Sequence, residues 1–513
     1  MTDRFPLRSL LVAGVAAAML LSGCVAVPPP PGGGVTTTTT PPEQVAPELQ
    51  VYYDQELQWT DCGNGNLCAD AQAPMDWDNP SSGDIWLAMV KTPASGKKIG
   101  SLFTNPGGPG ASGFDFVYDY SQFIFGKDVL ASYDIVGWDP RGVGQSSAVK
   151  CFVDDADKNR FLFEDEIDAK WGEPGYLPEV EMAYDYFIDA CLDDTEELLG
   201  YVDTVSTAHD LDLMRALVGD SKLNYVGFSY GAYLGGVYAD EFAEKVGRVV
   251  IDGPVNPAIS LTDLVIEQNQ GFEVGYQQFL ANCLAGKDCP FTGTIEEATQ
   301  QTIDLLARLE ESPLRAKDGR KLWGGSFTLS IASALYAEFT WPMLRTAIKD
   351  VMNGDAELAF NLIDSYHGRN PDGSFNDNSY EANIAINCLD YPVSRDIERW
   401  NRDFDRLKEL SPLLGPYGGY SELLCDMWPY QAKHERKAIT ASGSDPIIVV
   451  GSVYDTATPY RWAEELAATL ENGTLLTRDG QGHTSYGQGN RCIDGAVDAY
   501  LLHGTVPAKG TVC

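Results

Sequence analysis

Basic residues are scarce in this chain, and metal-ligand spacings are missing from it. Lysine and arginine together number 36 against 74 aspartates and glutamates, so the formal net charge is −38. Nucleic-acid binding needs clustered Lys and Arg, and this charge balance argues against nucleic acid as a partner. The sequence also has no Cys-x-x-Cys or His-x-x-x-His spacing. It therefore predicts neither a metal site nor a cofactor.

The N-terminus carries an apolar run that is too short for a permanent membrane span. Arg4 and Arg8 precede this run, "SLLVAGVAAAMLL". The tetrapeptide that follows, "LSGC", ends at Cys24 and resembles a bacterial lipobox, which implies cleavage before Cys24 and lipidation of its thiol. A plain secretory signal is the alternative. We expect residues 1–24 to be a signal peptide of an exported protein, either membrane-anchored through Cys24 alone or secreted.

The segment after this signal contains almost nothing that could pack into a core. It reads "VAVPPPPGGGVTTTTTPPEQVAP", and such a proline- and threonine-rich stretch favours an extended, solvated chain. We therefore expect residues 25–48 to form a tether and the globular part to begin near Leu49.

Cysteine usage agrees with export. Setting Cys24 aside leaves ten cysteines, an even number that suggests five disulfides. Ten cysteines allow on the order of a thousand pairings, and the spacing favours pairing of sequence neighbours. The favoured pairs are Cys62–Cys68, Cys151–Cys191, Cys283–Cys289, Cys388–Cys425 and Cys492–Cys513.

Short apolar strands alternate with helical patterns over much of the chain. The strand-like runs include "IGSLFTN", "YDIVGWD", "LNYVGF", "RVVID" and "PIIVVGS". This alternation predicts an α/β fold with a mostly parallel sheet, whose ligands lie at the carboxyl ends of the strands. Helical patterns without strands fill residues 256–387 and predict a cap inserted between two parts of the core, 49–255 and 388–513.

The pentapeptide "GFSYG" places Ser229 between one of these strands and a helix. Small residues on both sides of a serine allow a strained strand-to-helix turn that projects its hydroxyl into a cleft. A simple tight turn is the alternative for the pentapeptide alone, but the strand and helix around it favour Ser229 as a nucleophile.

A serine nucleophile needs a histidine base, and the chain has five histidines. His483 lies in the glycine-rich loop "DGQGHTSYG" after a strand, downstream of the serine. The chain order Ser, acid, His selects it. The other four, His209, His367, His434 and His503, are expected to be structural or surface residues.

Three aspartates compete for the role of the acid. Asp455 ends the strand that precedes the histidine strand, and 28 residues separate it from His483, enough for one helix and one strand. Asp252 also ends a strand, and Asp479 lies only four residues before the histidine. Asp455 is the favoured acid, and the other two remain alternatives.

The oxyanion that forms during acyl transfer needs backbone N–H donors. Tyr230, directly after the nucleophile and at the start of a helix, is expected to supply one. The loop "NPGGPG" is expected to supply the other, from Gly108 or, as the reserve, from Gly107.

Seven motifs in this order resemble the secreted tripeptidyl aminopeptidases of actinobacteria, which are α/β-hydrolases akin to prolyl aminopeptidases. The motifs are "NPGGPG", "GWDPRGVGQSS", "GFSYGAYLGGVYADEF", "VVIDGPVNP", "CDMWP", "GSVYDTATPY" and "GQGH". The resemblance implies an α/β-hydrolase fold, the triad Ser229, Asp455 and His483, the donors Gly108 and Tyr230, and a helical cap that restricts access to peptide ends.

An exopeptidase must also recognise the free α-amine of its substrate, usually with a carboxylate. Asp390, Glu267 and Glu273 are the candidates, and an exposed helix charge is the alternative for each. The predicted function is a serine exopeptidase acting on peptides with free N-termini, releasing tripeptides, dipeptides or single residues. A carboxylesterase or lipase on the same scaffold is the alternative.

Overall fold

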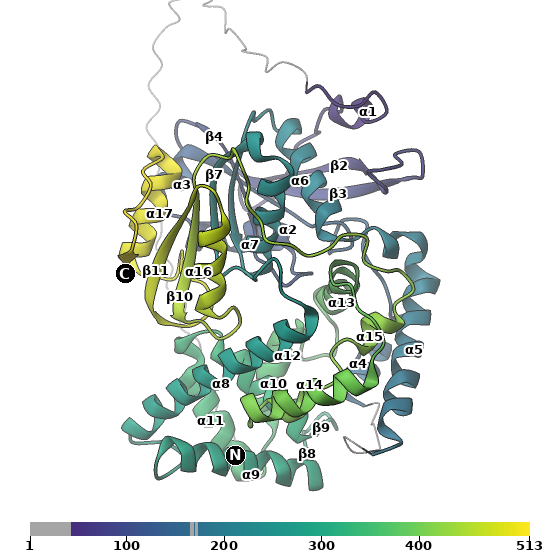
Figure 1. The fold of residues 1–513 in the computed structure, drawn as a ribbon, viewed down its shortest axis with the longest axis vertical. Helices are drawn as coiled ribbons and strands as arrows, with labels where there is room; N and C mark the ends of the chain where they lie inside the picture. Colours follow the sequence, from purple (N-terminus) through teal and green to yellow (C-terminus); the bar gives the residue numbers. More distant parts are fainter. Residues whose placement is uncertain (1–42, 165–168, 170–172) are drawn as a thin grey trace, which may run out of the picture. The chain divides into compact units, whose positions relative to one another are not determined.

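The computed structural model describes residues 43–164, 169 and 173–513 (Figure 1). The predicted signal peptide, Cys24 and most of the predicted tether lie outside the described residues. The last residues of that tether are described, and Glu43 there pairs with Arg215 at 3.2 Å and with Lys245 at 2.7 Å. The end of the predicted tether therefore contacts the core.

Ten of the described strands form one sheet in the order β1-β2-β3-β5-β4-β6-β7-β10-β11-β12 (Figure 1). The first four strands in that order pair antiparallel, and from β5 onward every neighbouring pair is parallel. This mostly parallel sheet confirms the predicted fold class. The strands are β1 (Thr60–Gly63), β2 (Asn66–Pro74), β3 (Asp84–Thr92), β4 (Gly100–Asn105), β5 (Tyr133–Trp138), β6 (Leu223–Phe228), β7 (Val246–Asp252), β10 (Ile447–Tyr454), β11 (Gly473–Gln481) and β12 (Thr511–Val512).

Helices cover both faces of the sheet because successive residues of a strand point to opposite faces. Val249 and Ile251 of β7 pack in the cluster that contains α6, α7 and α16, whereas Val250 packs in the cluster that contains α2, α3 and α17. The helices are α1 (Gln50–Tyr53), α2 (Gly113–Ile124), α3 (Lys127–Ser132), α6 (Thr204–Leu217), α7 (Tyr230–Glu241), α16 (Tyr460–Thr469) and α17 (Arg491–His503), and two 3-10 turns are η1 (Glu196–Gly200) and η2 (Ala243–Lys245).

A helical layer lies against the carboxyl ends of the parallel strands (Figure 1). Gln268 of this layer donates to the Ala457 carbonyl at 2.9 Å, and the His483 N–H donates to the Tyr336 carbonyl at 2.8 Å. Its elements are α8 (Leu261–Ala285), α9 (Ile295–Glu311), β8 (Leu314–Arg315), β9 (Lys321–Leu322), α10 (Gly324–Leu335), η3 (Glu338–Thr340), α11 (Trp341–Met352), α12 (Glu357–His367), α13 (Ser379–Asp390), α14 (Ile397–Leu410), η4 (Gly415–Tyr417) and α15 (Leu423–Met427).

Three parts of this arrangement differ from the sequence-based expectation. Helices continue past the predicted cap boundary at residue 387, although the pattern "DIERWNRDFDRLKEL" already indicates α14, and the sheet resumes with β10 as expected. Two further helices, α4 (Asp155–Phe163) and α5 (Tyr176–Thr195), precede α6, and a buried ion pair of 2.8 Å between Lys158 and Glu381 ties α4 to α13. Strands β1 to β3 were not expected either, because polar residues interrupt their apolar pattern.

The five disulfides of the structure are the five pairs that the spacing favours, so this prediction is confirmed. The Cys388–Cys425 bridge matters most for the site below, because it joins α13 to α15. Within the described part of the chain, every helix is too short or too polar to cross a membrane.

Candidate active site

Ser229 occupies a sharp turn between β6 and α7. Its backbone has φ 57° and ψ −123°, a left-handed conformation that a residue with a side chain seldom adopts. A Cβ atom on Gly227 would overlap the Gly231 carbonyl, and one on Gly231 would overlap the Asn105 carbonyl. Both flanking glycines are therefore required sterically, as the elbow interpretation of "GFSYG" predicts.

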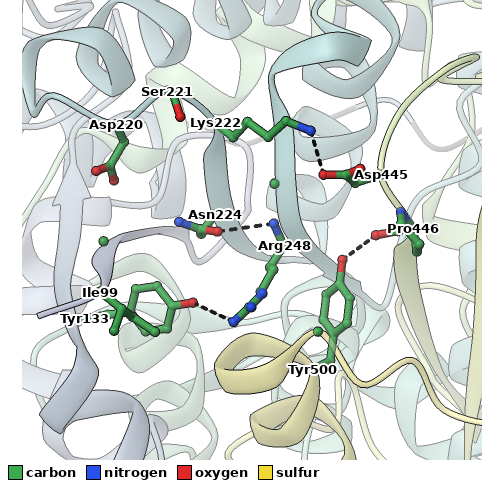
Figure 2. Close-up of a pocket in the computed structure, with 13 residues that line it drawn as sticks. Ile99, Tyr133, Asp220, Ser221, Lys222, Asn224, Arg248, Asp445, Pro446 and Tyr500 are labelled. Carbon is green, nitrogen blue, oxygen red and sulfur yellow. Dashed lines mark hydrogen bonds and ion pairs between the residues drawn. The ribbon is translucent and has the colours of Figure 1, made fainter. Parts of the chain in front are cut away.

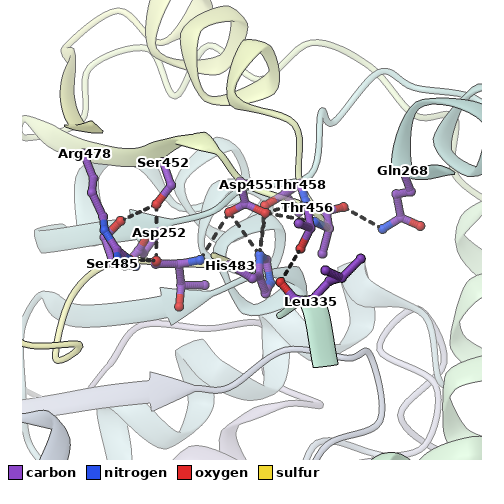
Figure 3. Close-up of polar contacts among 12 residues, drawn as sticks. Asp252, Gln268, Leu335, Ser452, Asp455, Thr456, Thr458, Arg478, His483 and Ser485 are labelled. Carbon is purple, nitrogen blue, oxygen red and sulfur yellow. Dashed lines mark hydrogen bonds and ion pairs between the residues drawn. The ribbon is translucent and has the colours of Figure 1, made fainter. Parts of the chain in front are cut away.

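His483 and Asp455 lie side by side at the ends of adjacent strands, β11 and β10 (Figure 3). The histidine Nδ1 is 2.9 Å from Asp455 Oδ1 and 3.1 Å from Oδ2. Both side chains are buried. Nδ1 donates to the carboxylate, which leaves Nε2 as the lone-pair nitrogen, and Nε2 has no hydrogen-bond partner in the described residues.

Backbone groups hold the Asp455 carboxylate in place. Its Oδ1 accepts the N–H groups of Ala457 at 3.0 Å and Thr458 at 2.9 Å, and its Oδ2 accepts that of Thr484 at 3.2 Å. The carboxylate in turn acts on the imidazole. Burial of the ring lowers its pKa, but the charge and hydrogen bond of Asp455 outweigh burial, so the pKa of His483 lies above its ordinary value.

Asp252, one rival for the acid, is buried next to this pair but contacts the loop and not the ring. Its Oδ2 accepts the N–H groups of Ser485 at 2.8 Å and Tyr486 at 2.7 Å, and its backbone carbonyl accepts the Ser229 N–H at 2.9 Å. Burial raises the pKa of Asp252 to about 7. Asp252 thus joins the serine turn to the histidine loop. The other rival, Asp479, is exposed on β11.

The four remaining histidines belong to other segments of the chain. His209 packs in α6 against the Trp77 and Phe242 rings, and His367 ends α12. His434 is exposed beside Asp203, and His503 ends α17.

The glycine loop "NPGGPG" packs directly against the serine turn. A Cβ on Gly107 would lie 2.6 Å from the Phe228 carbonyl oxygen and 2.9 Å from Ser229 Cβ. The Gly107 N–H donates to Asn105 Oδ1 at 2.9 Å and is therefore already used. The Gly108 N–H makes no hydrogen bond within the described residues, which favours Gly108 over Gly107 as an oxyanion donor.

A cavity of about 240 Å³ lies over Ser229, between the sheet and the helical layer. Gly108 and Tyr230 line it from the core. Side chains of the helical layer line the opposite side, and the sequence analysis missed them because no local motif marks them: Gln268, Phe272, Tyr336, Tyr366, Asn383 and Asn387. Tyr336 also stands edge-on to the His483 ring, with ring centroids 5.5 Å apart.

Asp390 lines the same cavity at the end of α13. Its carboxylate accepts two hydrogen bonds from Thr204, from the N–H at 2.8 Å and from the hydroxyl at 2.5 Å. The Thr204 hydroxyl also shares a 2.5 Å hydrogen bond with the Tyr230 hydroxyl. Burial raises the pKa of Asp390 to about 7, and the positive charge of Arg436, which lines the same cavity, opposes this shift.

Glu267 and Glu273, the two other candidates for amine recognition, do not line this cavity. Glu267 accepts a hydrogen bond from the Trp462 indole and pairs with Arg461, both on α16. Glu273 is buried within the helical layer, where it accepts from the Ser411 hydroxyl at 2.9 Å. Both carboxylates belong to α8, and each of them interacts with side chains outside the cavity.

A larger hollow of about 480 Å³ lies at the opposite, amino end of the strands (Figure 2). Its charged side chains already have partners: Lys222 pairs with Asp445 at 2.6 Å, and Arg248 contacts the Tyr133 hydroxyl at 3.4 Å. Within the described residues, Ser221 of this lining makes no hydrogen bond with an acid or a base. The smaller cavity over Ser229 is therefore the candidate active site.

Comparisons with known proteins agree with this geometry. The TAP-like protein family matches residues 411–513. The chain is 34% identical over 479 residues to the serine protease Hip1 of Mycobacterium tuberculosis, covering 90% of this chain and 91% of that protein. It is 32% identical over 453 residues to carboxylesterase B of the same species, covering 87% and 86%. It is 30% identical over 476 residues to the tripeptidyl aminopeptidase of Streptomyces coelicolor, covering 89% and 86%. The chain therefore belongs to the α/β-hydrolase family that includes serine protease Hip1 and the tripeptidyl aminopeptidases.

Proposed function

We propose that this chain is an exported serine exopeptidase that releases short peptides or single residues from free N-termini. The observation that carries the proposal is the position of Asp390, a buried carboxylate in the cavity of Ser229 that accepts hydrogen bonds from Thr204. A buried carboxylate is stabilised by an opposite charge, and the α-ammonium of a peptide supplies one. The names of two related proteins, a serine protease and a tripeptidyl aminopeptidase, support the same function.

The proposed reaction begins with attack of Ser229 Oγ on the scissile carbonyl carbon. His483 Nε2 removes the hydroxyl proton as the new C–O bond forms, and Asp455 stabilises the imidazolium through Nδ1. The carbonyl oxygen becomes an oxyanion, which the N–H groups of Tyr230 and Gly108 stabilise. Tyr230 begins α7, so the positive end of the helix dipole adds to this stabilisation.

Collapse of this intermediate breaks the C–N bond. The His483 imidazolium gives its proton to the leaving amine, and the N-terminal fragment remains as an ester on Ser229. A water molecule then attacks the ester with His483 again as the base. Return of the proton to Ser229 Oγ releases the fragment as a free carboxylic acid.

Asp390 determines which peptides reach this chemistry. Its ionised carboxylate holds the α-ammonium group, while the helical layer closes the cavity around the N-terminal fragment. An N-blocked peptide has no charge to offer and leaves the carboxylate unpaired, which costs about 2–5 kcal/mol for a buried charge pair.

A carboxylesterase is the second candidate, because the related carboxylesterase B carries that name and the proposed triad acts on esters by the same steps. The two candidates differ in their need for the amine. Asp390 would not contribute to the binding of an ester substrate that has no amine.

Three substrates separate these candidates: Ala-Ala-Pro p-nitroanilide with a free amine, its N-acetylated counterpart, and p-nitrophenyl butyrate. We expect the free peptide to be cleaved at least about 100-fold faster than the blocked one. Equal rates on the two peptides would contradict the exopeptidase, and turnover of the ester alone would support the carboxylesterase. Ser229→Ala is expected to lower every rate by at least about 10⁴-fold, whereas Ser221→Ala, an exposed serine before β6, changes none.

Export and anchoring complete the proposal. Five disulfides are consistent with an oxidising compartment. We further propose that Cys24 is lipidated and that residues 25–42 tether the catalytic part to the membrane. Labelling of the full-length protein with an alkyne fatty acid in a host that processes lipoproteins tests this step. The label should be lost in Cys24→Ala, and a label that persists in that variant would refute the anchor.

A further inference from the structure

Two hollows share one wall in this molecule. The cavity over Ser229 and a second hollow of about 250 Å³ are both lined by Tyr233, Asp390 and Arg436. Tyr233 belongs to α7 and Asp390 to α13. Arg436 belongs to the segment between α15 and β10, which has neither helix nor strand. Among these three residues, Arg436 is therefore the one that can be substituted without changing the sequence of a helix.

The Arg436 guanidinium is held by packing. It lies between the rings of Tyr233 and Tyr391, 4.1 Å from the centroid of each, where cation–π attraction favours it. Nη2 donates to the Asn256 carbonyl at 3.2 Å. Nε is buried and has no hydrogen-bond partner among the described residues, so it remains available to a carbonyl group of a bound peptide.

The second hollow is suited to a continuing peptide chain. Its inner lining includes the apolar side chains of Val205, Val237 and Ile439. Its outer lining includes His434 and Lys437, which are exposed, so the hollow reaches the surface. A peptide that extended past Tyr233, Asp390 and Arg436 would therefore make apolar contacts in the second hollow and could reach the solvent.

We propose that Arg436 ends the peptide-binding cavity and thereby sets the longest N-terminal fragment that the enzyme releases. The inference rests on the proposed function, since it places the substrate amine at Asp390 in the same wall. Each further residue extends a peptide by about 3.4 Å, and the packed guanidinium leaves no room for that extension. Removal of the Arg436 side chain takes away one of the three side chains that line both hollows.

A ladder of peptidyl p-nitroanilides with free amines and one to six residues before the scissile bond tests this assignment. We expect wild-type kcat/KM to fall sharply beyond one fragment length. Arg436→Ala should move that limit to longer fragments, with a rise of about tenfold or more in kcat/KM for the first excluded length. Arg436→Met keeps most of the side-chain volume and should keep the limit. Lys433→Ala, in the same segment, is the matched control.

A reversal experiment adds a second readout. Val205→Trp in the Arg436→Ala background refills the opened space and should restore the short limit, because Val205 lines only the second hollow of the two. A purely structural role of Arg436 would lower all rates together and would leave the length limit unchanged.

The outcomes distinguish this inference from the proposed function. Labelling of Ser229 by a fluorophosphonate shows that a variant is folded. An Arg436→Ala protein that takes the label and keeps the wild-type limit overturns the inference alone. A wild-type protein that cleaves the ester but no member of the ladder overturns the proposed function and the inference with it. Should Arg436→Ala lose the label, Arg436→Ser, whose side chain is also short, carries the same prediction.

Discussion

The cavity has two ends: a serine end around Ser229, and an amine end around Asp390 and Arg436, where the substrate amine is proposed to bind. These two ends are built in different ways. Ser229 is held by its two neighbouring glycines and by a backbone hydrogen bond to the next strand. At the amine end, Thr204 and Asp390 are 186 residues apart in the chain, and Arg436 comes from a third segment. The chemistry thus depends on short backbone motifs, whereas recognition depends on the docking of a helical layer onto the sheet.

This difference has a direct consequence for variants. Changes at the serine end should affect peptides and esters alike, because every acyl transfer uses the same groups. Changes at the amine end should affect peptides with free N-termini and spare small esters.

The largest effect is expected at the serine end, from Asp455→Asn. An amide in place of the carboxylate favours the wrong imidazole tautomer, so kcat should fall by about 10⁴-fold on both the peptide and the ester. Steady-state kinetics with both substrates measures this. Asp252→Asn is the control, since its carboxylate contacts backbone N–H groups and not the ring. A larger loss in Asp252→Asn would make Asp252 the acid.

The second effect concerns the bridge that holds the amine end. Cys388→Ala/Cys425→Ala removes a disulfide across 37 residues, which should cost about 4 kcal/mol of unfolding free energy by loop entropy. The KM for the free peptide should rise, because α13 carries Asp390, while the ester kcat is kept. Denaturant unfolding and kinetics measure both. The Cys283–Cys289 pair spans 6 residues, and its removal should cost about 2 kcal/mol without a change in KM.

Asp390→Asn should separate the two ends most clearly. The neutral amide loses the ion pair with the α-ammonium group, so kcat/KM for the free peptide should fall about 100-fold, with no change for the ester. Burial raises the pKa of Asp390 to about 7, and amine binding requires the ionised form. Wild-type kcat/KM on the peptide should therefore fall below about pH 7, and Asp390→Asn should lose this part of the acid limb.

Asp479→Asn removes an exposed carboxylate of the same charge and is the matched control for Asp390→Asn. Equal losses on peptide and ester in Asp390→Asn would place Asp390 in the structure of the serine end instead of in amine recognition.

The smallest effect is a pH dependence of stability at Asp252. Burial raises the folded-state pKa of Asp252 to about 7, above the value in an unfolded chain. A raised carboxyl pKa stabilises the fold at low pH, and this contribution is lost as the pH rises through the folded value. Between about pH 6 and about pH 8 the loss is about 1.4 kcal/mol. Urea unfolding of wild type and Asp252→Asn at both pH values measures it, and parallel pH dependences would contradict it.

Much of the core and of the serine end could be predicted from the sequence. Continuous β-branched runs predicted β4, β5, β6, β7, β10 and β11, and glycines at fixed offsets predicted the turn at Ser229. The loops with Asp455 and His483 were predicted because parallel strands bring their carboxyl ends to one edge. These features depend on spacing over a few residues.

The positions of side chains in the helical layer could not be predicted from the sequence. Asp390, Glu267 and Glu273 were equivalent as sequence candidates, each a carboxylate on a helical pattern. Only packing distinguishes them: Glu267 faces α16, Glu273 is buried inside the layer, and Asp390 lines the cavity over Ser229. Arg436 had no sequence signal at all, because its role depends on two rings from other elements.

The sequence by itself indicated the fold class and the candidate nucleophile with its partners, because each follows from local geometry or from the order of strands in a parallel sheet, and it favoured the disulfide pairs through their spacing. The tertiary structure alone decided which candidate carboxylate lines the cavity over Ser229, which glycine N–H makes no hydrogen bond within the described residues, and which side chains border the cavity. Those answers depend on contacts between segments nearly two hundred residues apart. Such contacts form only when the helical layer packs onto the sheet and buries their charges together.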